Sequence, residues 1–205
     1  VERPVAVVPN PVPPAGRAPV PLPAGPPRFL WVARCEPEKR PLVFADAVLA
    51  ARARTDAAFG VDVVGEGSQL RELRARLAGL ESVRVHGGQP HERVLELIDA
   101  AAIVVLTSLG FDNQPMTIAE AVSRHRGVLY CDPALAEGLR HCGVLAAGPG
   151  AAELGAAIAG LAADPRRLGR IAEAAERDAT EFGPARFVER IEAVYARAAA
   201  EAKTR

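Results

Sequence analysis

Short apolar runs alternate along the chain with longer segments in which apolar residues recur every three or four positions. The short runs have the composition of buried strands, and the longer segments have the periodicity of amphipathic helices. Strands are predicted at residues 29–34, 61–64, 83–87, 103–107, 127–131 and 143–146. Helices are predicted at residues 42–54, 68–77, 92–101, from 115 onward, and at 135–140, 151–163, 165–179 and 184–200.

Strands that alternate with helices in this way form right-handed βαβ units. The sequence therefore predicts an α/β fold, with a mostly parallel sheet of about six strands, helices on both faces and further helices at the C-terminal end. The last of these helices carries an apolar stripe with Phe187 and Tyr195 at helical spacing, which predicts a place in the core or at a domain interface.

The N-terminal segment differs from the rest, since residues 1–27 hold ten of the eighteen prolines. This composition predicts extended chain without a packed element. Only Val5 to Val8 has the pattern of a short strand. We expect a proline-rich linker at residues 1–27 and one folded domain at residues 28–205.

The most informative stretch is Ser108 to Val122, which follows the strand at residues 103–107. It passes through a polar turn with Asp112 and Asn113 and enters a helix with Pro115 in its first turn. A strand, a turn and a helix N-terminus together make an anion site. Glu120 lies one to two turns into the helix, outside that site. On these residues alone, an ordinary strand, turn and helix with a solvated acid is equally compatible.

Two other strand ends carry residues of interest. Arg34 and Lys39 follow the first strand, and two cations at the carboxyl edge of a sheet can hold a diphosphate, although cations in such loops are usually just solvated. The second strand runs into Gly65-Glu66-Gly67, which a tight turn with a helix N-cap at Ser68 explains nearly as well as a ligand site does. NAD binding is disfavoured, because a dinucleotide fingerprint needs glycine where Leu70 stands.

Composition limits the classes of binding partner and the cellular compartments that are expected for this protein. Lys plus Arg and Asp plus Glu each total 25, so no net charge attracts nucleic acid or anionic membranes. Cys35, Cys131 and Cys142 have no metal-binding spacing and predict buried, reduced thiols in a cytoplasm. The abundance of Ala, Arg, Gly and Pro is typical of GC-rich bacterial genes. No apolar run approaches the roughly 18 residues of a membrane span, and the absence of an initial Met indicates a piece of a longer protein.

These segments resemble the retaining glycosyltransferases of the large family 4 group, which have two Rossmann-like domains in the GT-B arrangement. The family's acidic motif has two Glu residues separated by seven others, and Asp112 and Glu120 keep that spacing with Asp in the first place. The resemblance implies that Asp112 faces the donor sugar and that Glu120 binds the ribose. It also implies that Arg34 and Lys39 hold the donor phosphates.

The resemblance covers about residues 28–200, and it departs where Ala33 and Arg40 replace glycines of the family's phosphate loop. The implied catalytic residues are Asp112, Arg34 and Lys39. The implied donor-binding residues are Arg34, Lys39, Gly65, Gly67, Gly87, Gln89, Asp112, Asn113, Gln114, Met116, Thr117 and Glu120. Arg34, Lys39 and the backbone N–H groups of residues 116–118 would stabilise the leaving diphosphate. Because two cations serve and no Asp-x-Asp motif is present, no metal or other cofactor is expected.

The implied function is that of the donor-binding half of a retaining glycosyltransferase, a hexosyltransferase that uses a UDP-, GDP- or ADP-sugar. In the family the acceptor site lies in a preceding domain, which this chain lacks. The half is therefore expected to be inactive alone, residues 1–27 to cross between the domains, and any peripheral membrane contact to involve the missing domain. One alternative is a non-catalytic nucleotide-binding or interaction domain of the same fold, and another is a sugar-nucleotide epimerase of related fold.

Overall fold

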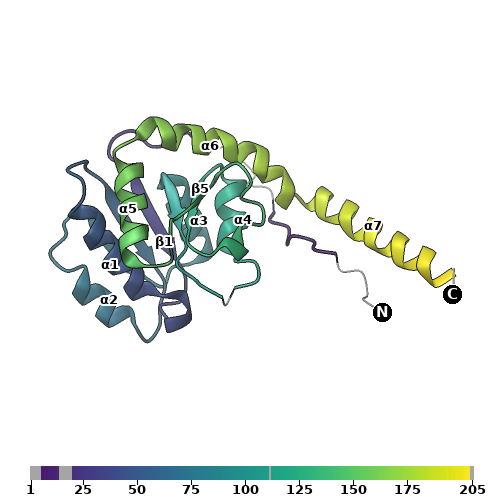
Figure 1. The fold of residues 1–205 in the computed structure, drawn as a ribbon, viewed down its shortest axis with the longest axis horizontal. Coiled ribbons are helices and arrows are strands. Elements are labelled where there is room, and N and C mark those ends of the chain that lie inside the picture. The colour runs from purple at the N-terminus through teal and green to yellow at the C-terminus, as the bar shows by residue number, and fades with distance from the viewer. Residues whose placement is uncertain (1–5, 14–19, 111, 204–205) are drawn as a thin grey trace.

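The sheet of this protein is entirely parallel. The computed structural model describes residues 6–13, 20–110 and 112–203 (Figure 1). Within these ranges six strands pair in the order β3-β2-β1-β4-β5-β6. They are β1 (Arg28–Val32), β2 (Gly60–Val64), β3 (Val83–Gly87), β4 (Ile103–Val105), β5 (Gly127–Tyr130) and β6 (Gly143–Leu145). The order is that of a Rossmann fold, which confirms the predicted α/β class.

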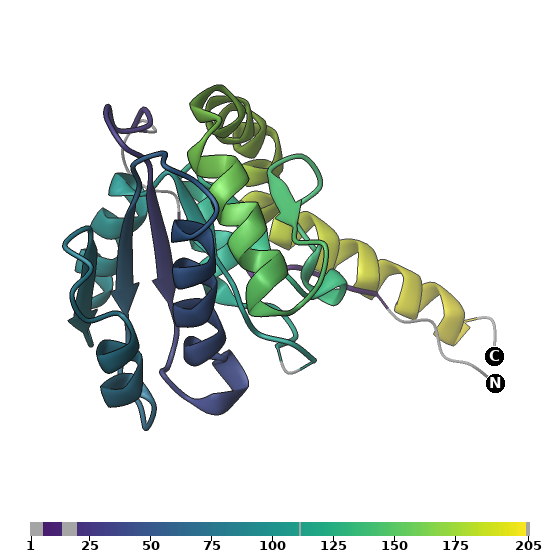
Figure 2. The ribbon, with the colours of Figure 1, turned by 60° about the vertical axis from the view of Figure 1, so that its left-hand side comes forward.

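Helices cover both faces of the sheet (Figures 1 and 2). Helices α1 (Pro41–Arg52), α2 (Leu70–Arg76) and α5 (Ala151–Ala162) pack together on one face. Helices α3 (His91–Ala100), α4 (Met116–Ser123) and α6 (Pro165–Ala179) pack together on the other. The short 3₁₀ helices are η1 (Pro37–Lys39), η2 (Pro133–Leu135) and η3 (Thr180–Phe182), and α7 (Pro184–Lys203) extends away from the body of the fold.

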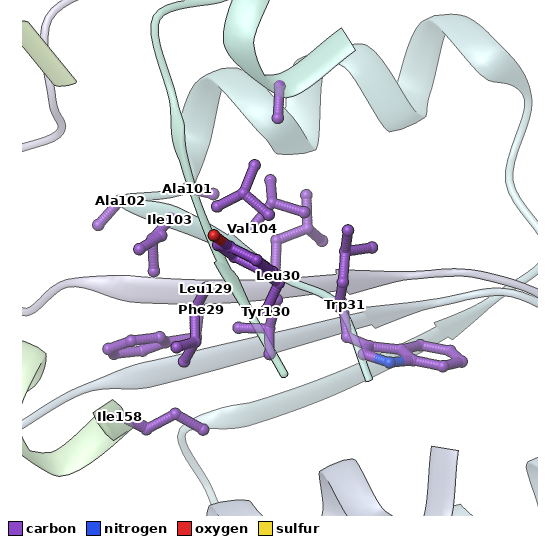
Figure 3. Close-up of a cluster of buried hydrophobic side chains, with 14 of the residues drawn as sticks. Phe29, Leu30, Trp31, Ala101, Ala102, Ile103, Val104, Leu129, Tyr130 and Ile158 are labelled. Atoms are coloured by element: carbon purple, nitrogen blue, oxygen red, sulfur yellow. The ribbon is translucent and has the colours of Figure 1, made fainter. Parts of the chain in front are cut away.

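The central strand β1 places Phe29, Leu30 and Trp31 in a cluster of buried hydrophobic side chains (Figure 3). Trp31 stacks on Phe44 of α1 with ring centroids 6.0 Å apart, and Phe29 meets Phe59 edge to face at 5.5 Å. Burying each such side chain stabilises the fold by roughly 1.5–3 kcal/mol. The carboxyl end of β1 therefore starts from a rigid base, which matters because the candidate site lies there.

Several predicted boundaries are wrong, each for a local reason. The helix expected at residues 135–140 is only the short η2, because Gly138 takes a left-handed conformation (φ +73°) that interrupts a helix. Helix α2 begins at Leu70 rather than at Ser68, and α4 begins after Pro115 rather than including it. No strand forms at residues 6–8, and Val5 of that predicted strand lies outside the described residues.

The N-terminal segment packs along the domain, and residues 6–13 run beside α7 in Figure 1. The N–H of Val12 donates to the carbonyl of Phe182 (2.9 Å), and Arg126 donates to the carbonyl of Pro21 (3.4 Å). The aromatic stripe of α7 is not core, since Tyr195 is 70% exposed. The assignment of residues 1–27 as an interdomain linker remains a prediction.

Two predictions from composition can be compared with the structure. Cys35, Cys131 and Cys142 are all buried free thiols, as expected. Among the described helices, none combines the length and the apolar character that crossing a bilayer requires.

Candidate functional site

The strand order creates a crevice between β1 and β4. The chain leaves β1 toward one face and β4 toward the other, and ligands of open α/β sheets bind outside the carboxyl ends of the strands at such a switch point. The loop after β1 carries Arg34 and Lys39, and the loop after β4 carries Asp112. The topology thus gathers the three predicted catalytic residues at one edge of the sheet.

A buried hydroxyl joins the two loops. Thr107 donates from Oγ1 to the carbonyl of Lys39 (2.6 Å) and accepts from the indole Nε1 of Trp31 (2.9 Å). Arg40 donates to the carbonyl of Thr107 (3.2 Å) and to that of Pro149 (2.8 Å). Thr107 is only 1% exposed. The backbone at Lys39 is therefore held in place by the core of the domain.

Lys39 and Asp112 meet as an ion pair, Nζ to Oδ1, and their side chains are only 16% and 11% exposed. The second carboxylate oxygen of Asp112 is buried and has no hydrogen-bond partner among the described residues. The same is true of Nε2 of Gln114, whose Oε1 accepts from the N–H of Asn10 (2.6 Å). Buried polar atoms are normally paired, so these two atoms retain hydrogen-bonding capacity that the described residues do not use.

The turn between β4 and α4 is held from the next strand. Asp132, at the end of β5, accepts from the N–H of Gly110 through Oδ2 (2.7 Å) and from Ala134 through Oδ1 (3.0 Å). Phe111, next in the predicted motif, lies outside the described residues. The sequence analysis missed this role, although a strand followed by Asp and Pro is a common cap signal.

The glycines after β2 are explained by close packing of two loops. A Cβ on Gly65 would lie 1.8 Å from the carbonyl oxygen of Ala33, and one on Gly67 would lie 2.6 Å from that of Cys35. Both residues also have φ values of +142° and +151°, which side chains disfavour. The N–H of Gly65 donates to the carbonyl of Gly87 (2.9 Å), so three of the predicted glycines are brought together.

Ser68 joins the same two loops instead of capping α2. Its hydroxyl and N–H both donate to the carboxylate of Glu36, at 2.5 and 2.9 Å. These bonds lower the pKa of Glu36, because they stabilise its charged form. The predicted N-cap at Ser68 is therefore wrong, and the residue links neighbouring loops.

Other predicted residues have more local roles. Arg34 is 63% exposed on the surface of its loop and pairs with Glu38 at 2.8 Å. Gln89 donates to the carbonyl of His86 (3.1 Å), and Asn113 is exposed. Arg34 does not join the pair that Lys39 and Asp112 form.

Glu120 points into a separate small cavity between α3 and α4. Its carboxylate lies 2.8 Å from Nε2 of His91, and the cavity has a volume of about 240 Å³. Met116 forms part of the wall, with Leu95 and Val12. The sequence analysis did not identify the pairing of His91 with Glu120.

The start of α4 offers two free donors rather than the predicted three. The N–H of Ile118 donates to the carbonyl of Pro115 (3.0 Å), whereas those of Met116 and Thr117 have no acceptor within the described residues. Two unpaired N–H groups at a helix start favour an anion. Among the residues that the structure describes, no cluster of three His, Cys, Asp or Glu side chains could hold a metal ion.

Comparison with known proteins gives a consistent result. The sequence profile of the family described as "Glycosyl transferases group 1" matches residues 26–164, which is more than half of the chain. A search of curated protein sequences found no significant match.

Solved structures share the fold at low sequence identity. A TarM variant from S. aureus, in complex with UDP and α-GlcNAc-glycerol, has a TM-score of 0.72 and 17% identity over 85% of this chain and 37% of its own. A glycosyltransferase from Rickettsia africae has a TM-score of 0.71 and 19% identity over 84% of this chain and 48% of its own. HepE from Anabaena, in complex with UDP and glucose, has a TM-score of 0.68 and 20% identity over 82% and 48%. The chain thus spans less than half the length of these three proteins.

Proposed function

This chain belongs to the group 1 glycosyl transferases, and we propose that it is the donor-binding half of a retaining glycosyltransferase that acts on a nucleotide-sugar. The observation that carries the proposal is the pair of Lys39 and Asp112 at the switch point of the sheet. A cation that can hold phosphate stands there beside a carboxylate oxygen that has no partner among the described residues. A nucleoside diphosphate joined to a hydroxyl-rich sugar matches both groups.

The residues divide between the parts of such a donor. Lys39 and Arg34 take the diphosphate together with the N–H groups of Met116 and Thr117, and their positive charge stabilises the charge that develops on the leaving diphosphate. Asp112 takes the sugar hydroxyls, aided by the neighbouring amides of Asn113 and Gln114.

The nucleoside of the donor lies on the other side of the start of α4. Glu120 takes the ribose hydroxyls, and Met116 forms an apolar wall beside them. Gly65, Gly67, Gly87 and Gln89 shape the edge against which the base rests. Each of these roles is a proposal that rests on the family resemblance and on the placement of the residues at one edge of the sheet.

The acceptor is proposed to bind to a preceding domain, so this half alone is expected to be inactive. The support is the length comparison, in which the chain spans 37–48% of three structural relatives. We also propose a cytoplasmic protein, because three buried free thiols suit a reducing compartment.

A second candidate is a nucleotide-binding domain without catalysis. One observation favours it, since the Asp112 carboxylate is already engaged by Lys39 instead of lying free for a sugar. Binding without turnover in the full-length protein would select this candidate.

The proposal is tested by calorimetric titration of the chain with UDP, GDP and ADP. We expect one nucleotide to bind with a micromolar to low-millimolar dissociation constant, and the double variant Arg34→Ala/Lys39→Ala to weaken it by at least about tenfold. The matched control, Arg166→Ala/Arg170→Ala, removes two exposed cations of α6 and should bind like the wild type. If none of the three nucleotides binds, the proposal is contradicted.

A further inference from the structure

We propose that Asp112 is a built-in competitor of the donor diphosphate for Lys39, so that phosphate must displace the carboxylate before Asp112 can engage the sugar. This inference rests on the proposed function, because it concerns the order of events in the same site. It assigns to Asp112 a role toward Lys39 that is distinct from its role toward the donor.

The geometry makes Asp112, rather than Lys39, the partner that moves. The Lys39 carbonyl is fixed by the Thr107 hydroxyl (2.6 Å), and Thr107 is itself fixed by Trp31 (2.9 Å). Asp112 lies in the turn before α4, outside any helix or strand. The backbone at Lys39 therefore stays in place, and rotation of the short Asp112 side chain is enough to break the pair.

The charges make the two occupants mutually exclusive. An ammonium group has three donors and one positive charge, and the carboxylate of Asp112 already neutralises it in a nearly buried setting. A diphosphate that approaches the same ammonium meets a like charge at short range and low dielectric, which disfavours simultaneous occupancy. The carboxylate occupies the place beside the ammonium that a phosphate would take.

The exchange links phosphate binding to sugar recognition. Once a phosphate pairs with the Lys39 ammonium, the Asp112 carboxylate is released, and both of its oxygens can accept hydrogen bonds from sugar hydroxyls. A nucleoside diphosphate that carries no sugar must also displace the carboxylate from Lys39, but it gains no contact between Asp112 and sugar hydroxyls. The site should therefore discriminate in favour of the nucleotide-sugar and against the nucleoside diphosphate that remains after transfer.

The test is a titration of wild type and Asp112→Asn with the nucleoside diphosphate that binds best among UDP, GDP and ADP, and with the corresponding glucose nucleotide. The Asn side chain keeps the shape and removes the charge. We expect Asp112→Asn to bind the nucleoside diphosphate roughly 5- to 20-fold more tightly. The additional affinity that glucose gives the wild type should shrink in the variant. Thermal unfolding confirms that the variant is folded, and Asp112→Ser replaces it if the Asn protein does not fold.

The control is Glu92→Gln, which removes an exposed negative charge from the first turn of α3, at the same edge of the sheet. Equal tightening in this control would overturn the inference, because the effect would then be one of general charge. If the wild type binds the nucleoside diphosphate and Asp112→Asn binds it with equal or lower affinity, the inference is overturned and the proposed function still stands. Binding by neither protein would contradict both, and binding by Asp112→Asn alone would support the inference.

Discussion

Single residues hold the site together through hydrogen bonds between distant parts of the chain. The Thr107 hydroxyl accepts from the indole of Trp31 in β1 and donates to the carbonyl of Lys39. Lys39 lies 68 positions before Thr107 in the sequence. The site lysine is thereby tied to the aromatic core. A side chain that contacts no ligand can still set where a ligand's phosphate binds.

The first prediction concerns this hydroxyl. Thr107→Val keeps the shape of the side chain, but removes the acceptor of the buried indole N–H of Trp31 and the hydroxyl that donates to the carbonyl of Lys39. We expect the free energy of unfolding to fall by about 1–3 kcal/mol in urea denaturation. Thr107→Ser keeps the hydroxyl and should lose less. A loss in Thr107→Ser as large as that in Thr107→Val would contradict the prediction, because Ser keeps the hydroxyl and lacks only the methyl group.

Arg40 has a strained backbone, since it adopts a left-handed conformation with a φ of +55°. A side chain in this conformation costs about 1 kcal/mol compared with glycine. Its guanidinium compensates by donating to the carbonyls of Thr107 (3.2 Å) and Pro149 (2.8 Å). The glycine that the family has at this position would avoid the strain but lose the contacts.

The second prediction separates these two contributions. Arg40→Ala loses the hydrogen bonds and keeps the strained backbone, whereas Arg40→Gly loses both. Arg40→Gly should therefore be more stable than Arg40→Ala by about 1 kcal/mol in chemical denaturation. An Ala variant as stable as the Gly variant would mean that the loop relaxes when the side chain is removed.

At the scale of elements, a buried carboxylate fixes the last strand to α6. Asp178 accepts from the N–H of His141 (2.7 Å), from Nδ1 of His141 (2.6 Å) and from the N–H of Cys142 (2.9 Å). Burial alone raises the pKa of Asp178, but these hydrogen bonds outweigh it and hold the pKa below its ordinary value. The contact positions β6 at the edge of the sheet.

The third prediction follows from the sign of that shift. Because the folded-state pKa is lowered, the contribution to stability is present above the unfolded pKa, near pH 4, and is lost as the pH falls through the folded pKa. At pH 7, Asp178→Asn should lower the free energy of unfolding by about 2 kcal/mol. The difference from wild type should shrink below about pH 4. Denaturation curves between pH 7 and pH 3 measure it.

The control for this prediction lies at the other end of the same helix. Asp164 caps the start of α6 by accepting from the N–H of Arg167 (2.9 Å), and Asn is an equally good cap. Asp164→Asn should change the free energy of unfolding by less than about 0.5 kcal/mol. A pH-independent deficit in Asp178→Asn would contradict the electrostatic explanation.

At the scale of the whole molecule, the folded body ends at Phe182. This residue is fully buried in η3, and its carbonyl accepts from the N–H of Val12 in the N-terminal segment (2.9 Å). Beyond it α7 extends outward beside residues 6–13 (Figure 1), and Val188 and Tyr195 are exposed on it. The helix therefore adds little to the core.

The fourth prediction compares the two sides of this boundary. Removal of residues 184–205 should leave a cooperative unfolding transition and cost at most about 3 kcal/mol, because none of the side chains at residues 184–201, where burial is described, is fully buried. Phe182→Ala in the intact chain should cost about 3–5 kcal/mol, because it empties a packed site. Circular dichroism during urea denaturation measures both. A truncated chain that unfolds without cooperativity would place α7 within the folding unit.

The sequence by itself determined the strands, most of the helices and the loops that carry the site. These features depend on local periodicity, which a chain displays before it folds. The loops after β1 and β4 were identified because polar residues followed apolar strands, as with Lys39 and Asp112. The helix starts at Ser68 and Pro115 were misplaced by one or two residues, and Ser68 was misplaced because it donates to Glu36 in another loop.

Only the tertiary structure decided the strand order and the partner of each charged group. Lys39 rather than Arg34 meets Asp112, across 73 positions of sequence, and Glu120 meets His91. Such pairs depend on which segments the sheet and helices bring together in space. Their partners lie too far apart in the chain for any local pattern to indicate them, and so the ion pair behind the proposed competition is visible only in the folded molecule.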